Sequence, residues 1–283
     1  MTMNLARYLA GPFALAALAV AGGAQGLTIE YSRDRAAELV ECDRIAYRGD
    51  ALAARNCFQA LVANNPDARI KADAARAAGD LRGANGHFQA ALREYPQDPA
   101  VRVRWGELFL ATHQANEAAK LFQEALELDP EYSPAKLGLA KVGANRFEES
   151  ARDWAQEVVD DAADASMAAR LMLARTRLED GAIDAGDEHL NEALVLAERH
   201  GFPPLEVYAL KASVDLLRGV TDSPWTQRAL EYNPSYGEIY ATPAYFYVIT
   251  RRYREAIALL QKAVEIQPEL YSAHAELGVS VLD

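Results

Sequence analysis

A pair of helical segments that returns along the chain constrains the fold of this sequence more than any other feature. Residues 99–132 and residues 237–270 are both 34 residues long and carry similar side chains at matching places. In the first window Trp105 and Phe109 are four residues apart, which places them on one face of a helix. Pro130 then ends a second helix, because proline has no backbone N–H to donate and cannot continue a helix. The recurrence predicts helical hairpins that stack on one another, since a single hairpin cannot bury its own apolar face.

The matching places hold side chains of a defined size. Gly106 and Ala118 are small residues where the two helices of a hairpin are expected to cross closely, and Ala244 and Ala256 take the same two places in the second window. A larger residue is expected to fill the gap to the neighbouring hairpin. A residue at this repeat position recurs at intervals of 30 to 36 residues along the chain. The residues at this place are Phe58, Phe88, Phe122, Trp154, Leu190, Thr226 and Leu260.

This pattern resembles the tetratricopeptide repeat family, whose 34-residue unit has Gly at position 8, Ala at position 20 and Pro at position 32. In the two windows these positions hold Gly106, Ala118, Pro130, Ala244, Ala256 and Pro268. The resemblance implies an all-α fold, a right-handed α-solenoid of about seven helical hairpins and one extra helix. It covers residues 34–283, nearly the whole of the chain.

In this family the concave face of the solenoid, lined by the first helix of each hairpin, binds a partner polypeptide. Carried over to this chain, the predicted partner-binding residues are Val103, Glu107, Leu110, Glu238, Ala241, Tyr245, Val248 and Ile249. The family's carboxylate clamp needs a Lys and an Asn where Val103 and Glu107 stand, so the clamp is absent. Tyr245, Val248 and Ile249 suit an apolar or aromatic peptide segment. The alternative is that the aromatic side chains pack between repeats.

The end of the chain also fits the repeat. Residues 271–282 match the first helix of a further hairpin, and the sequence stops at Asp283 without the second helix. Solenoids usually end in a cap with a polar outer face. We therefore expect the chain to be part of a longer protein that is cut in the middle of a repeat. The alternative is that this uncapped helix meets another chain, including a second copy of itself.

The first 24 residues carry the three-part pattern of a secretory signal peptide. A basic side chain precedes an apolar run of 14 residues, Tyr8–Ala21, and small residues at 19–21 and 22–24 offer two cleavage sites. The run is too short to cross about 30 Å of hydrocarbon comfortably, which disfavours an uncleaved anchor. We expect residues 1–24 to be a signal peptide and residues 25–33 a short extension. The mature chain is then periplasmic or secreted and has no integral membrane span.

The two cysteines of the chain, Cys42 and Cys57, fit an exported protein, because exported proteins reach an oxidising compartment. They stand 7 residues before and 8 residues after Gly49, the expected turn of a hairpin. In an antiparallel hairpin they face each other at about the same height. The spacing leaves two interpretations open: a disulfide, if the two Cα atoms are within about 7 Å, or two small buried residues in the hairpin interface.

Composition and motifs exclude several classes of function. Hydrophobic residues make up 51% and charged residues 25% of the chain, as in ordinary folded proteins. The net charge of −12 disfavours nucleic acid, whose phosphates repel an acidic protein. None of the five histidines belongs to a His-Glu-x-x-His helix, and the sequence has no P-loop and no nucleophile elbow. We therefore expect no cofactor, no metal and no enzymatic activity within these residues.

Two functions follow as hypotheses. The first is an exported, non-catalytic scaffold that binds a partner polypeptide through the concave face. The second is the N-terminal recognition region of a larger exported enzyme. The stretch from Tyr208 through Pro234 to Leu282 is similar to exported bacterial proteins in which such repeats precede a zinc peptidase-like domain. That catalytic domain would lie beyond Asp283.

Overall fold

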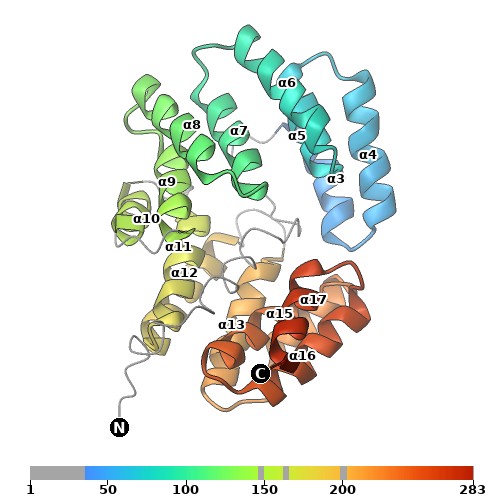
Figure 1. Ribbon diagram of the computed structural model, residues 1–283, viewed down its shortest axis with the longest axis vertical. Helices are drawn as coiled ribbons and strands as arrows, with labels where there is room; N and C mark the ends of the chain where they lie inside the picture. Colours follow the sequence, from blue (N-terminus) through green and yellow to red (C-terminus); the bar gives the residue numbers. More distant parts are fainter. Residues whose placement is uncertain (1–35, 146–149, 162–165, 198–202, 283) are drawn as a thin grey trace. The chain divides into compact units, whose positions relative to one another are not determined.

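The structure, a computed structural model, describes residues 36–145, 150–161, 166–197 and 203–282. In these ranges it has fifteen α-helices and no strand (Figure 1), which confirms the expected all-α fold. The helices are α3 (Ala37–Tyr47), α4 (Ala51–Asn64), α5 (Ala68–Ala77), α6 (Leu81–Glu94), α7 (Pro99–Ala111), α8 (Ala115–Leu128), α9 (Ser133–Asn145), α10 (Ser150–Asp161), α11 (Ser166–Glu179), α12 (Ile183–Ala197), α13 (Leu205–Leu217), α14 (Pro224–Tyr232), α15 (Glu238–Ile249), α16 (Tyr253–Ile266) and α17 (Tyr271–Leu282). None of them is long and apolar enough to cross a bilayer.

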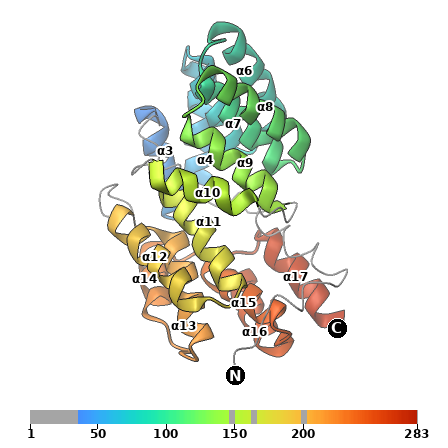
Figure 2. The ribbon, with the colours of Figure 1, turned by 90° about the vertical axis from the view of Figure 1, so that its left-hand side faces the viewer.

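The described helices divide into two compact units. Of the described residues, those from 36 to 169 belong to the N-terminal unit, and those from 170 onward belong to the C-terminal unit. The odd-numbered helices α3, α5, α7, α9, α13 and α15 each pair with the even-numbered helix that follows. We call the odd-numbered helices the first helices. First helices also contact the next first helix, as α5, α7 and α9 do in one unit and α13, α15 and α17 do in the other. Figure 2 shows α16 and α17 beside α15 at the end of the C-terminal unit. The predicted extent of the array, residues 34–283, stays a prediction.

Aspartate side chains cap the N-termini of several helices. The side chains of Asp50, Asp67, Asp80 and Asp98 accept hydrogen bonds from backbone N–H groups in the first turns of α4, α5, α6 and α7. These caps satisfy donors that a helix start otherwise leaves unpaired. Gly49, in the turn between α3 and α4, has a φ of +91°, a conformation that costs little only for glycine. The ends of these hairpins are therefore local consequences of the sequence.

Phe122 shows how neighbouring hairpins pack. This ring of α8 is fully buried and lies against two glycines on first helices, Gly106 of α7 and Gly138 of α9. A Cβ atom at Gly106 would come within 2.6 Å of Phe122 Cε1, and one at Gly138 within 2.6 Å of Cδ1. The sequence pattern suggested that Gly106 allows two helices to cross. In the structure both glycines make room for the ring, because the ring inserts between the two first helices.

Four of the other six large residues of the pattern are buried, as Phe122 is. Phe58, Phe88, Leu190 and Leu260 are at most 3% exposed. Trp154 and Thr226 are only partly buried. Thr226 lies on α14, which with nine residues is the shortest helix in the described ranges. A short second helix with a polar residue at the packing position buries less apolar area, so this hairpin depends more on its neighbours.

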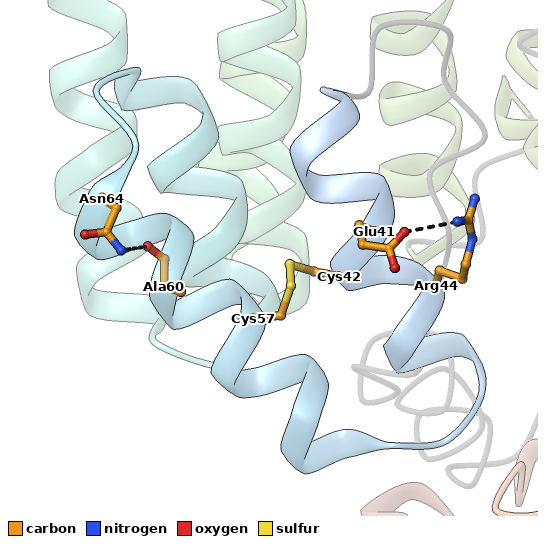
Figure 3. Close-up of a disulfide and its surroundings, with 6 residues drawn as sticks. All are labelled: Glu41, Cys42, Arg44, Cys57, Ala60 and Asn64. Carbon is orange, nitrogen blue, oxygen red and sulfur yellow. Dashed lines mark hydrogen bonds and ion pairs between the residues drawn. A yellow bond between two sulfur atoms is a disulfide. The ribbon is translucent and has the colours of Figure 1, made fainter.

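Cys42 of α3 and Cys57 of α4 form a disulfide that joins the two helices of the first hairpin (Figure 3). Their Cα atoms are 5.5 Å apart, within the usual range for a disulfide. Cys42 is fully buried in a cluster with Leu39 and Phe58. The bridge closes a loop of 15 residues. In the chain-entropy model such a loop contributes about 3 kcal/mol by restricting the unfolded chain.

We expect Gly138→Ala to lower the free energy of unfolding by about 1–3 kcal/mol, because the new methyl group would overlap the buried Phe122 ring. Gly86→Ala on α6 is the matched control. A Cβ atom there has no neighbour within 4 Å, so the change should raise the free energy of unfolding by about 0.5–1 kcal/mol. Urea unfolding followed by circular dichroism measures both values. Equal effects of the two substitutions would contradict the insertion of Phe122 between first helices.

Candidate functional site: the first-helix face

The side chains that neighbouring first helices present together form a surface that we call the first-helix face. In the N-terminal unit its charges are paired across helices. Glu107 of α7 lies between Arg76 of α5 and Lys141 of α9, with N–O distances of 3.7 and 3.2 Å. Arg104 of α7 donates a hydrogen bond of 3.0 Å to Asp73 of α5, whose side chain has no exposed area. Each carboxylate in this set therefore has a cation beside it.

A cavity of about 390 Å³ opens beside these pairs and is lined in part by Asp67, Arg69 and Asp98. Arg69 bridges the two aspartates, with N–O distances of 2.8 and 3.2 Å. Its guanidinium lowers the pKa of Asp67 by hydrogen bonding, against the opposing effect of burial. The charges that line this cavity are thus already matched within the unit.

The predicted partner-binding residues separate into two groups in the structure. Val103, Ala241 and Tyr245 are at least 92% buried, so their side chains have little area to offer a partner. Val103 packs in one apolar cluster with Phe122, and Ala241 packs in another with Leu260. The remaining predicted residues are partly exposed: Glu107, Leu110, Glu238, Val248 and Ile249. These five are the predicted residues that a partner could reach.

Tyr245 is held by its neighbours inside the C-terminal unit. Its hydroxyl donates a hydrogen bond of 3.0 Å to Glu179 Oε1. The Arg175 guanidinium lies 4.8 Å from the centre of the Tyr245 ring and donates to the same carboxylate at 3.2 Å. Burial, followed by the charge of Glu179, raises the pKa of Tyr245. The structure therefore favours the packing role that the sequence left open for this aromatic residue.

Three glutamates on first helices of the same unit have raised pKa values: Glu206 of α13, Glu238 of α15 and Glu276 of α17. Glu206 and Glu238 both lie in the first turn of their helices. Glu276 is 94% buried. The charge of Glu238 acts on Glu206, and the charge of Glu276 acts on Tyr245.

Burial is the main influence on the acidity of each of these glutamates. It raises the pKa of Glu206 to about 8, with a further contribution from the charge of Glu238. It also raises the pKa of Glu238, against the opposing charge of Arg175, and the pKa of Glu276. A helix N-terminus ordinarily favours the charged form of a carboxylate. The loss of water around Glu206 and Glu238 outweighs that effect.

The sequence analysis found Glu238 and missed Glu206 and Glu276. A glutamate in the first turn of two helices, 32 residues apart, was the available signal. The described residues contain no group of three or more His, Cys, Asp or Glu side chains that could hold a metal ion.

Comparison with known proteins agrees with the repeat pattern. Tetratricopeptide repeat models match residues 71–133 and residues 237–270, so the chain contains tetratricopeptide repeats. No curated protein matches the sequence.

Solved structures of low sequence identity share the fold. The APC/C hetero-tetramer Cut9–Hcn1 has a TM-score of 0.61 at 16% identity, over 90% of this chain and 50% of that chain. The human IFIT1 dimer with m7Gppp-AAAA has a TM-score of 0.56 at 16% identity, over 96% of this chain and 70% of that chain. A tetratricopeptide repeat protein from Parabacteroides merdae has a TM-score of 0.53 at 16% identity, over 86% of this chain and 98% of that chain. The chain spans half the length of the Cut9–Hcn1 chain that it matches.

We expect Tyr245→Ala to lower the free energy of unfolding by about 3–5 kcal/mol, because it leaves a cavity inside the C-terminal unit. Tyr245→Phe removes only the hydrogen bond to Glu179 and should cost about 1 kcal/mol. Tyr271→Ala is the control, since Tyr271 is 77% exposed and should change stability by no more than about 0.5 kcal/mol. Denaturant unfolding measures all three. A small effect of Tyr245→Ala, similar to that of Tyr271→Ala, would show that Tyr245 lies on the accessible surface and is not packed inside the unit.

The raised pKa of Glu206 predicts a pH dependence of stability. A carboxyl group with a pKa of about 8 in the folded chain, against about 4.3 when unfolded, binds more protons in the folded state between those values. Its contribution to stability is thus present at low pH and is lost as the pH rises towards 8. Between pH 5 and pH 8 the free energy of unfolding of the unchanged chain should fall by about 3–4 kcal/mol more than that of Glu206→Gln. Glu231→Gln, at an exposed position, is the control and should keep the pH dependence of the unchanged chain. A Glu206→Gln profile parallel to those of the unchanged chain and the control would contradict the raised pKa of Glu206.

Proposed function

We propose that this chain, which contains tetratricopeptide repeats in an all-helical solenoid fold, is an exported scaffold that binds a partner polypeptide and catalyses no reaction. The observation that carries the proposal is the contact between successive first helices in each unit. Side chains from different hairpins are brought together there into one extended face. Such a face can hold a polypeptide in contact with several helices at once.

The composition of the face supports a polypeptide as the partner. Leu110 of α7 and Val248 and Ile249 of α15 are apolar and partly exposed. Charged side chains lie on the same first helices. A mixture of apolar contacts and charged groups is typical of surfaces that recognise a peptide segment. The net charge of −12 argues against nucleic acid as the partner of this chain.

Export rests on the N-terminal sequence and on the cysteines. Residues 1–24 carry the signal-peptide pattern but lie outside the described residues. The disulfide between Cys42 and Cys57 suits an oxidising compartment, since disulfides are rare in the reducing cytosol. Export by cleavage predicts that the mature chain begins after Ala21 or Ala24. N-terminal sequencing of the chain from its natural cells would find one of these ends, and a chain that retains Met1 would overturn cleavage.

Site-specific photo-crosslinking in the natural cells tests the binding face. A photoreactive amino acid at Val248, on first helix α15, should give one discrete adduct with a partner protein. The same amino acid at Glu188 is the control, since Glu188 is exposed on second helix α12. The proposal expects the adduct at Val248 and not at Glu188. No adduct at Val248, or the same adducts at both positions, would overturn binding through the first-helix face.

A further inference from the structure

The cavity of about 390 Å³ in the N-terminal unit lies at first helices α5 and α7, and we call it the α5–α7 recess. Its deepest lining residues are apolar. Phe88 of α6 is 1% exposed and Val101 of α7 is 2% exposed, and each belongs to an apolar cluster of the unit. Ile70 of α5 and Ala100 of α7 also line the recess and are partly exposed. The floor of the recess is therefore part of the apolar core.

Polar side chains form the rim of the recess. Arg69 of α5 lies between Asp67 and Asp98, with N–O distances of 2.8 and 3.2 Å. These three side chains are between 21% and 36% exposed, so a group that approaches from solvent can reach them. Arg104 of α7 also lines the recess and donates a hydrogen bond of 3.0 Å to Asp73. The two arginines and two aspartates that line the recess balance each other in charge.

This rim has little to offer a charged ligand. Asp67 and Asp98 also accept hydrogen bonds from the backbone N–H groups of Arg69 and Ala100. The starts of α5 and α7, which would otherwise attract an anion, are therefore capped within the unit. A cation would have to compete with Arg69 for the same two aspartates. An ion in the recess would thus lose its water without gaining a partner of opposite charge, which is costly.

A neutral aromatic side chain meets no such cost. It would bury about 150–250 Å² of its own surface, and the apolar floor rewards that burial. The volume of the recess is near the lower end of the range for ligand pockets, about 300–1,000 Å³, so it suits one large side chain rather than a helix. A guanidinium group on the rim attracts the face of an aromatic ring. Arg69 already makes this kind of contact within the unit, because its guanidinium lies 3.9 Å from the centre of the Tyr95 ring.

We infer that the α5–α7 recess receives a neutral aromatic side chain of the partner polypeptide as the anchor of binding. This inference rests on the proposed function and adds the chemistry of the partner, a segment that carries an exposed tryptophan, tyrosine or phenylalanine. Aromatic anchors that fill a desolvated pocket carry much of the binding energy at protein interfaces. The recess lies on first helices α5 and α7, so a segment anchored there lies on the first-helix face.

Binding of model peptides to the full 283-residue chain tests the inference. The probe is the peptide Ac-Gly-Ser-Trp-Ser-Gly-amide, and the comparison peptides have Ala, Lys or Glu in place of Trp. Titration followed by the backbone amide NMR signals of the chain gives the affinities. The Trp peptide should bind at least about tenfold more tightly than each comparison peptide. The signals of Arg69, Ala100 and Arg104 should shift on binding, and those of α16 should not.

A substitution that fills the recess provides a second test. Ala100→Phe should weaken binding of the Trp peptide at least about tenfold, because the new ring would occupy the recess. Ala77→Phe is the matched control, since Ala77 is exposed at the end of α5 and does not line the recess. The control should weaken binding less than about twofold. Circular dichroism shows that each variant is folded, and the amide signals of the unchanged chain decide if Ala100→Phe is not.

Several results would overturn the inference. They are no binding of the Trp peptide to the unchanged chain, equal weakening in the two variants, binding of the Lys or Glu peptide as tight as that of the Trp peptide, and shifts confined to signals outside the recess. Binding of tryptophan amide as tight as that of the peptide would assign the recess to a small aromatic molecule. Binding that appears only after residues 25–35 are removed would assign the recess to the chain's own N-terminal segment.

The outcome is separable from that of the proposed function. A discrete adduct at Val248 in cells, without binding of the Trp peptide, would keep the scaffold and remove the aromatic anchor. Absence of the adduct, with Trp-peptide binding that Ala100→Phe abolishes, would keep an aromatic-binding recess and remove the scaffold that binds through α15.

Discussion

The insertion of a large side chain from one hairpin between two first helices is the interaction on which the rest of the structure depends. Phe122 makes it most clearly, because its ring is fully buried against both Gly106 and Gly138. A hairpin by itself exposes such a ring, and only the next hairpin covers it. Stacking of hairpins is therefore required for each to be stable. The same packing brings first helices into contact and so creates the first-helix face.

The first-helix face combines rigid packing with charge. Residues that sequence reasoning placed on a binding surface, such as Val103 and Ala241, instead belong to the apolar clusters that hold the hairpins together. The charged residues beside them differ between the units. Ion pairs across helices link Asp73 and Glu107 to cations, whereas in the C-terminal unit Glu238 Oε1 is buried without a hydrogen-bond partner among the described residues. A repeat array can thus keep one packing scheme while the chemistry of its face changes along the chain.

The comparison structures share the fold of this chain but little of its sequence. At 16% identity they share the stacking of helical hairpins with this chain and differ in most side chains. A fold shared at this identity does not fix a partner, because binding depends on the particular side chains of a site.

The sequence by itself determined the helical hairpins, their ends and the opposition of Cys42 and Cys57, because these features depend on residues close together in the chain. Aspartate caps, turn glycines and the spacing of apolar residues act within a few turns. Tertiary structure alone decided that Tyr245 is buried and that Gly138 receives the Phe122 ring. Those properties depend on side chains 16 to 66 residues away on other helices. Local periodicity places a glutamate on a helix, but only the stacked neighbours decide whether a cation stands beside it.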